Sequence, residues 1–73
     1  MKLLINGEDR DFETGGVFSL SALVERLGMK SDRVAIELNR DIVPRDRWPD
    51  IQLKEGDRLE IVHFVGGGAE YSS

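Results

Sequence analysis

The stretch KLLINGEDRDF, residues 2–12, decides the fold because it encodes two short strands around a tight turn. KLLIN is a short, mostly apolar run, and Asn6-Gly7 is a pair that two-residue hairpin turns favour, since both turn positions need a positive φ. EDRDF, residues 8–12, then predicts a returning strand. The chain is therefore expected to begin with an antiparallel hairpin.

One main helix is predicted after the Gly15-Gly16 pair, which interrupts regular structure. Ser19 can cap this helix, because its hydroxyl can accept hydrogen bonds from N–H groups of the first turn. Gly28 suits the left-handed conformation that often follows the last helical residue. The apolar residues between them recur at i, i+3, i+4 and i+7. One apolar face of the predicted helix is therefore formed by Leu20, Leu23, Val24 and Leu27.

The second half of the chain predicts two strands and a short edge strand. Residues 34–39 alternate in the way expected of a strand with one buried face. Pro44 and Pro49 interrupt the next segment, so we expect a short edge strand, a turn of loose helix and a brief extended piece. Residues 54–58 predict a turn, and LEIVHFV, residues 59–65, predicts the last strand.

The order strand, strand, helix, strand, short strand, strand is that of the ubiquitin-like β-grasp fold. We therefore expect an α+β domain over residues 1–65, with a mixed sheet of four to five strands and one main helix. The first and last strands should lie side by side in parallel at the centre of the sheet. The predicted core comprises Leu3, Ile5, Phe12, Leu20, Leu23, Leu27, Ile36, Leu38, Leu59 and Ile61.

Composition limits the possible functions. The 73 residues include no cysteine and one histidine, His63, so disulfides, thiolate metal sites and histidine clusters are excluded. The net charge of −4 disfavours nucleic acid as a partner, because neutralising phosphates needs a basic surface. No apolar run approaches the roughly 20 residues of a membrane span, and no signal peptide is predicted. We expect a cytoplasmic protein without a metal, a cofactor or a membrane partner.

No catalytic arrangement can be assembled from the sequence. His63 falls within the last predicted strand, where a semi-exposed side chain is the simpler interpretation than a functional one. The glycine-rich segments at residues 15–20 and 65–70 lack the spacing of a phosphate-binding loop. Trp48, which lies near two prolines, is interpreted as a cover for the open end of the core. The chain is therefore not expected to be an enzyme.

The glycine triplet Gly66, Gly67 and Gly68 is the main candidate for function. Each glycine loses more conformational freedom on ordering than any other residue, so residues 66–73 are expected to form a mobile tail with a short extension. Three extended residues reach about 10 Å, and glycines have no side chain to obstruct a narrow channel. On the triplet alone, a linker without function is an equal interpretation.

Four segments resemble the sulfur carrier family of thiamine biosynthesis, ThiS: INGEDRDF, VAIELNRDIVPRDRW, LKEGDRLEIVHFVGGG and the helix that begins after a serine. The resemblance covers residues 1–68. Its most specific part combines Asn39, residues 42–45, Trp48, Gly56-Asp57 and the terminal glycines. The glycine ending by itself is shared with other ubiquitin-like carriers.

The resemblance implies a chemistry for the tail. In the family, an E1-like adenylyltransferase uses ATP and magnesium to activate the carboxylate of the last glycine, here Gly68. A sulfur-donating enzyme then supplies the sulfur of a thiocarboxylate, which passes to thiazole synthase. Gly66 and Gly67 would thread the tail into these enzymes. The carrier is expected to be a monomer when free.

A partner-binding surface is predicted on the last strand. Because Leu59 and Ile61 are expected to face the core, strict alternation turns Val62 and Phe64 outward. Two large apolar side chains on an exposed strand face favour an interface. We expect Val62 and Phe64, with Arg45, to bind the activating enzyme and the thiazole synthase.

Residues 69–73 depart from the family pattern, because family members end at the glycines. With Ala69 attached, Gly68 carries an amide and offers no carboxylate to adenylate. Trimming after Gly68 is the preferred interpretation; a non-native extension and a lost carrier role are the alternatives. Two other functions also stay open, namely a carrier for molybdopterin or another pathway, and a non-conjugated ubiquitin-like binding module.

Overall fold

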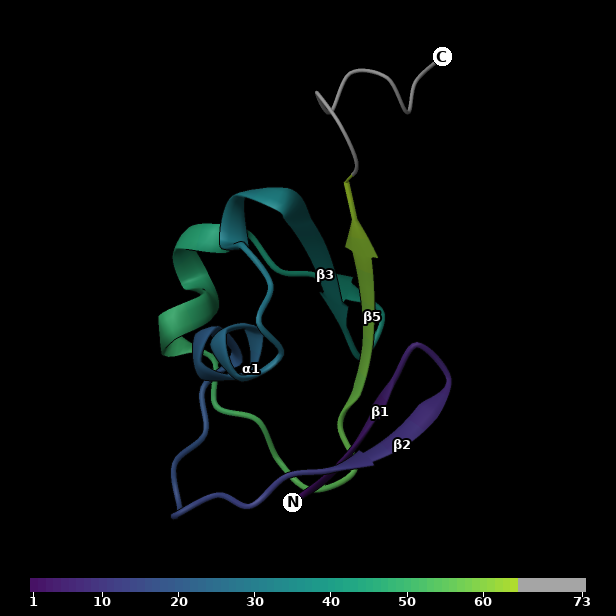
Figure 1. Ribbon diagram of the computed structural model, residues 1–73, viewed down its shortest axis with the longest axis vertical. Coiled ribbons are helices and arrows are strands. Elements are labelled where there is room, and N and C mark those ends of the chain that lie inside the picture. The colour runs from purple at the N-terminus through teal and green to yellow at the C-terminus, as the bar shows by residue number, and fades with distance from the viewer. Residues whose placement is uncertain (65–73) are drawn as a thin grey trace.

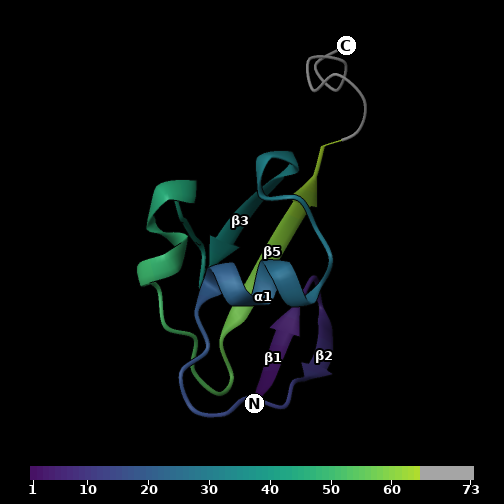
Figure 2. The same cartoon turned by 60° about the vertical axis from the view of Figure 1, so that its left-hand side comes forward.

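The computed structural model describes residues 1–64 and shows a five-stranded mixed sheet with helical segments on one face (Figures 1 and 2). The strand order in the sheet is β2-β1-β5-β3-β4. The strands are β1 Lys2–Ile5, β2 Glu8–Asp11, β3 Val34–Leu38, β4 Asp41–Ile42 and β5 Arg58–His63. The helical segments are α1 Leu20–Arg26 and the two 3-10 helices η1 Ser31–Arg33 and η2 Arg45–Asp50.

The first turn adopts the conformation that its sequence predicts. Asn6 and Gly7 have φ values of 52° and 84°, so both turn positions are left-handed, as a type I′ hairpin requires. This turn sets the register of β1 against β2, which pairs Ile5 with Glu8 and Lys2 with Asp11. The predicted hairpin is confirmed, although its second strand ends one residue before Phe12.

The central strands β1 and β5 run parallel, as expected, with Ile5 beside Leu59. The strand β5 pairs on its other side with β3 in an antiparallel ladder that brings Ala35 opposite Val62. Figure 2 shows α1 crossing in front of these strands. The fold is thus an α+β ubiquitin-like β-grasp, and the predicted fold class is confirmed.

The helix α1 begins where the sequence predicts. The Ser19 hydroxyl oxygen accepts a hydrogen bond from the Ala22 N–H at 3.1 Å, which satisfies one donor of the first turn. Gly28 follows the helix with a φ of 75°, which a residue with a Cβ adopts only with strain. Leu27 is the C-terminal cap of the helix.

The core lies between α1, η2 and the inner face of the sheet. Eight of the ten predicted core residues are buried, but Leu27 and Leu38 are only half-buried and pack against its edge. Both exceptions have the same cause, because Leu27 follows the last residue of α1 and Leu38 is the last residue of β3, where cover from neighbouring elements ends. The core also includes Phe18, Val24, Val34, Trp48 and Leu53.

The segment between β3 and β5 folds around Trp48. This side chain is 2% exposed, and its indole N–H donates a hydrogen bond to the Val43 carbonyl at 3.0 Å. The interpretation of Trp48 as a cover for the core is therefore confirmed. Pro49 lies inside η2, where a 3-10 helix takes the place of the loose helical turn expected from the prolines.

Candidate functional site

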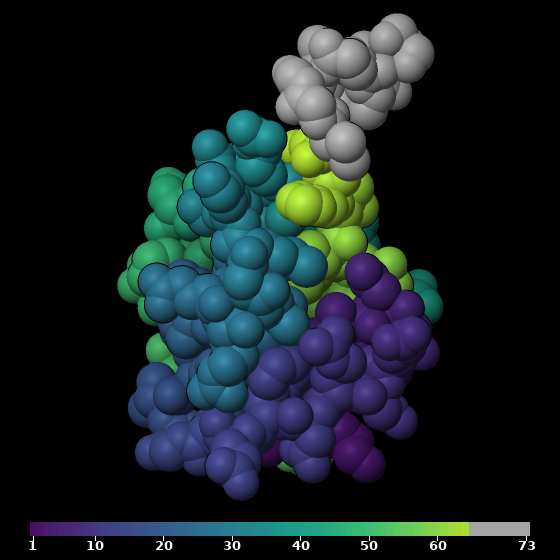
Figure 3. Space-filling view, in the orientation of Figure 1, coloured from purple at the N-terminus to yellow at the C-terminus, as the bar shows by residue number. Residues whose placement is uncertain are grey.

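The described part of the chain ends just after β5. Phe64 follows β5, and its backbone N–H donates a hydrogen bond to the Arg33 carbonyl at 2.7 Å. The Arg45 side chain donates from Nε to the carbonyl of Ser31 at 2.8 Å. Phe64 and Arg45 are therefore both anchored to η1, which lies beside the end of β5 on the surface in Figure 3.

The structure places the three predicted partner-binding residues differently from one another. Val62 is 57% exposed on the outer face of the sheet, as alternation along β5 predicts. Phe64 lies after the last residue of β5 and is half-buried, which corrects the expectation that it is an exposed residue of the strand. Arg45 is exposed at the start of η2, and the hydrogen bond from its side chain to the Ser31 carbonyl of η1 fixes the direction of that side chain.

Ile42 is a surface residue that the sequence interpretation did not assign to the site. It is 75% exposed in β4 and lies directly opposite Glu37 of β3. The sequence signal was present, since a large aliphatic residue in a short edge strand has little core to cover. Ile42 lies on the outer face with Val62, around a shallow hollow of about 100 Å³ lined by Ala35, Ile36, Glu37, Ile42, Glu60 and Val62.

Two asparagine side chains hold β5 in place. Beyond the end of β1, Asn6 bonds both backbone groups of Ile61: its amide oxygen accepts from the N–H at 2.7 Å, and its amide nitrogen donates to the carbonyl at 3.1 Å. On the other side, the Asn39 oxygen accepts from the Arg58 N–H at 3.0 Å. These side chains extend the ladders of β1 and β3, so they position the strand that carries the candidate site.

Asp57 completes this support just before β5. It is 7% exposed, and its carboxylate accepts hydrogen bonds from the Lys54 N–H at 2.8 Å and from the Asn39 amide at 3.1 Å. A buried carboxylate needs such donors to offset its lost hydration. The resemblance at Asn39 and Gly56-Asp57 therefore marks residues with a structural role.

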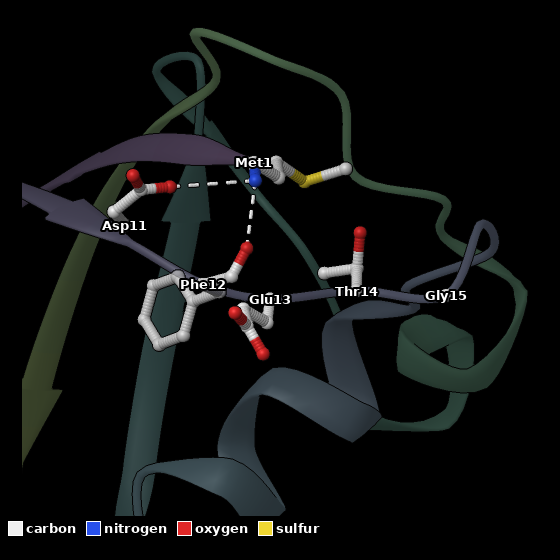
Figure 4. A pocket seen from close by; sticks show the side chains of 6 residues that line it. All are labelled: Met1, Asp11, Phe12, Glu13, Thr14 and Gly15. Atoms are coloured by element: carbon white, nitrogen blue, oxygen red, sulfur yellow. Dashed lines mark hydrogen bonds and ion pairs between the residues drawn. The ribbon is translucent and has the colours of Figure 1, made fainter.

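A second hollow lies far from the end of β5, at the other end of the sheet (Figure 4). It measures about 820 Å³ and lies beside the N-terminus and residues 11–15. The Met1 ammonium group donates to the Phe12 carbonyl at 2.7 Å and pairs with the Asp11 carboxylate at 3.4 Å. These contacts tie the N-terminus to the hairpin.

Other chemical sites are not visible among residues 1–64. His63 is exposed at the end of β5. No three His, Cys, Asp or Glu side chains in this part of the chain gather as a metal site would require. None of its helices is long and apolar enough to cross a membrane. The predicted reactive residue Gly68 and the threading residues Gly66 and Gly67 lie outside the described residues.

Known proteins resemble both the sequence and the fold. The model of the ThiS family matches residues 3–68. The chain is 35% identical over 68 residues to a sulfur carrier protein ThiS from Bacillus subtilis, covering 90% of this chain and 98% of that protein. It is 44% identical over 70 residues to a thiazole synthase from Paramagnetospirillum magneticum, but spans only 21% of that protein's length, against 96% of its own.

The fold gives the same result. A crystal structure of a thiamine biosynthesis protein, ThiS, from Geobacter metallireducens superposes with a TM-score of 0.79 at 28% sequence identity. The superposition covers 93% of this chain and all of the other. The family match includes the support residues Asn39 and Asp57, the β5 strand and the glycine triplet. On the agreement of sequence and fold, this chain belongs to the ThiS family.

Proposed function

We propose that this protein is a sulfur carrier in the synthesis of the thiazole ring of thiamine. The observation that carries this proposal is the family match over residues 3–68, because it extends through the fold and into the glycine triplet. The relative named thiazole synthase favours the thiazole pathway over the synthesis of molybdopterin. In this role the protein carries a reactive group between enzymes in the cytoplasm and is not itself a catalyst.

The proposed chemistry takes place at the carboxylate of Gly68. An oxygen of that carboxylate attacks the α-phosphorus of ATP on an E1-like adenylyltransferase, and pyrophosphate leaves. Sulfide released by a sulfur-donating enzyme then attacks the acyl carbon, its C–S bond forms as the C–O bond to AMP breaks, and AMP leaves with the oxygen it activated. The product is a thiocarboxylate, which thiazole synthase uses as its sulfur source. Adenylation is needed because a carboxylate oxygen is by itself a poor leaving group.

Gly66 and Gly67 would thread the reactive end into the partner enzymes. Three residues at about 3.3–3.6 Å each span roughly 10 Å, which suits a reactive end that must reach a buried centre. Residues 69–73 must be removed first, because the peptide bond to Ala69 occupies the Gly68 carbonyl. Trimming after Gly68 is therefore part of the proposal.

The end of β5 would bind the activating enzyme and the thiazole synthase through Val62, Phe64 and Arg45. Val62 offers an exposed aliphatic side chain, and the hydrogen bond from the Arg45 side chain to the Ser31 carbonyl limits the freedom of that side chain in the unbound protein. The Phe64 backbone bonds to the Arg33 carbonyl, which fixes the position from which its side chain extends. Side chains that are already ordered lose less entropy on binding. The free protein would be a monomer, and its partner enzymes would bind the folded domain while the tail reacts.

The test compares the full chain with a version that stops at Gly68. Each is incubated with ATP, magnesium, the cognate E1-like enzyme and a sulfur donor, and intact masses are recorded. The shorter form should gain the mass of an oxygen-to-sulfur exchange, and the full chain should gain it only after cleavage. Gly68→Ala in the shorter form is the matched variant and should react more slowly, because its methyl group must enter a channel shaped for glycine.

Two results would contradict the proposal in different ways. If the full chain became thiolated with Ser73 still attached, the reactive residue would not be Gly68. If neither form reacted, the protein would instead be a binding module that uses the ubiquitin-like fold without conjugation.

A further inference from the structure

The outer face of the sheet carries an apolar patch that no described element covers. The helices pack against the inner face, and the outer face presents Ile42 at 75% exposure and Val62 at 57%. The register explains how residues distant in sequence meet there: Ala35 lies opposite Val62, and Ile42 lies opposite Glu37. We call Ala35, Ile42 and Val62 the outer patch.

Two carboxylates border the outer patch, one on β3 and one on β5. Glu37 and Glu60 lie directly opposite each other on β3 and β5, and like charges in this position destabilise a sheet. Arg40 and Arg58 line a neighbouring hollow with them, yet within residues 1–64 neither glutamate forms an ion pair with either arginine. The two carboxylates therefore lie beside two arginines without forming an ion pair to them, and each can still accept one from a cation of another protein.

The size of the apolar hollow indicates what kind of group can occupy it. Its volume is about 100 Å³, whereas small-molecule sites usually measure about 300–1,000 Å³. A single side chain of another protein suits a hollow of this size better than a substrate does. Lysine and arginine fit the chemistry as well, since their aliphatic stems cover apolar surface while their charged heads remain near polar groups.

The charges also argue against a second copy of this chain as the occupant. A symmetric dimer through the outer patch would bring the Glu37 and Glu60 carboxylates of both copies into one interface. Like charges placed together across an interface oppose association. The net charge of −4 acts in the same direction. A basic protein surface is the better complement.

We infer that the outer patch binds a lysine or arginine of the thiazole synthase, with its stem over Ile42 and Val62 and its charged group between Glu37 and Glu60. This inference rests on the proposed function and adds a recognition element to it. Thiazole synthase is the chosen partner because the relative of that name contains a region 44% identical to this chain within one polypeptide. A region built into the synthase chain has the synthase surface as its permanent neighbour.

The test measures the affinity of the full chain for the purified cognate thiazole synthase by titration calorimetry at low and high salt. The double substitution Glu37→Gln and Glu60→Gln should weaken binding about tenfold at low salt, as expected for the loss of close interfacial charges. Its affinity should also depend less on salt than that of the unmodified chain. The matched control is the substitution Glu25→Gln. Glu25 is exposed on α1, and α1 covers the other face of the sheet, so this variant should bind like the unmodified chain.

A second variant separates the apolar contact from the charges. Ile42→Ser should weaken binding while leaving the salt dependence unchanged, and its high exposure means that folding should be little affected. Equal affinity of the unmodified chain and the double glutamine variant would overturn the inference but leave the proposed function intact. A loss of affinity for the activating enzyme alone would also overturn it. Absence of any binding by the unmodified chain would instead count against the proposed function itself.

Discussion

Replacing Leu23 with alanine tests how much of the stability depends on packing α1 against the sheet. Leu23 is fully buried on the inner face of α1, where its side chain is part of the core cluster. Removing a buried leucine side chain costs about 2–5 kcal/mol, because apolar contacts are lost and a cavity remains. A domain of 73 residues has a total stability of roughly 4–11 kcal/mol at 0.05–0.15 kcal/mol per residue. The substitution should therefore remove a large part of it.

The matched variant is Leu27→Ala, one turn further along the same face. Leu27 caps α1 and is only half-buried, so the same chemical change should cost about 1–2 kcal/mol. Since 1 kcal/mol shifts the midpoint of a domain this size by roughly 4–8 °C, the two variants should differ clearly in a thermal melt. The difference in stability between the two variants reports the effect of burial, because the same leucine-to-alanine change is made on the same face of the helical segment.

Urea unfolding followed by the fluorescence of the buried Trp48 supplies the free energies. The dependence on urea concentration should be the same for both variants and the unmodified protein, since all three expose nearly the same surface on unfolding. Equal losses at Leu23 and Leu27 would refute the argument, because they would show that α1 is not packed with the burial described here. No loss at Leu23 would refute it more directly.

Three further predictions concern the hairpin turn, the glutamate pair and the end of β5. Asn6→Gly should cost about 1–3 kcal/mol in urea unfolding, because it keeps the left-handed turn but removes both hydrogen bonds to Ile61; a neutral effect would mean that solvent replaces them. Glu60→Gln should raise the melting temperature slightly at low salt by relieving repulsion from Glu37, with a smaller gain at high salt; a lower melting temperature would show that the carboxylate stabilises the fold. Phe64→Ala should weaken binding to the activating enzyme and the thiazole synthase while circular dichroism shows an intact fold; unchanged affinity for both enzymes would exclude Phe64 from the interface.

Stability and recognition should respond in opposite directions to one substitution. Glu60→Gln is expected to stabilise the isolated domain and, together with Glu37→Gln, to weaken its contact with the synthase. Natural proteins retain unfavourable local arrangements mainly where function needs them. A substitution at Glu60 that improved both properties would remove this explanation of the glutamate pair.

Local signals in the sequence were sufficient to predict the fold. Asn6-Gly7 predicted the hairpin because few other residues adopt a positive φ at two consecutive positions. Ser19 and Gly28 bounded α1 correctly because capping depends on hydrogen bonds and backbone angles within a few residues. The error at Leu27 also has a local origin, since periodicity gives the face of a helix but not the point where its cover ends.

The sequence by itself determined the main helix, the strands and their order, because each depends on the conformational preferences of neighbouring residues. Only the tertiary structure decided which side chains share the outer face. Ile42 and Val62 come from strands on either side of β3, and Glu37 meets Glu60 through a register between segments more than 20 residues apart. The side chain of Asn6 binds the N–H and the carbonyl of Ile61 on β5, which is likewise 55 residues away in sequence. Such pairings follow from the packing of the whole sheet on its core, which no local pattern encodes.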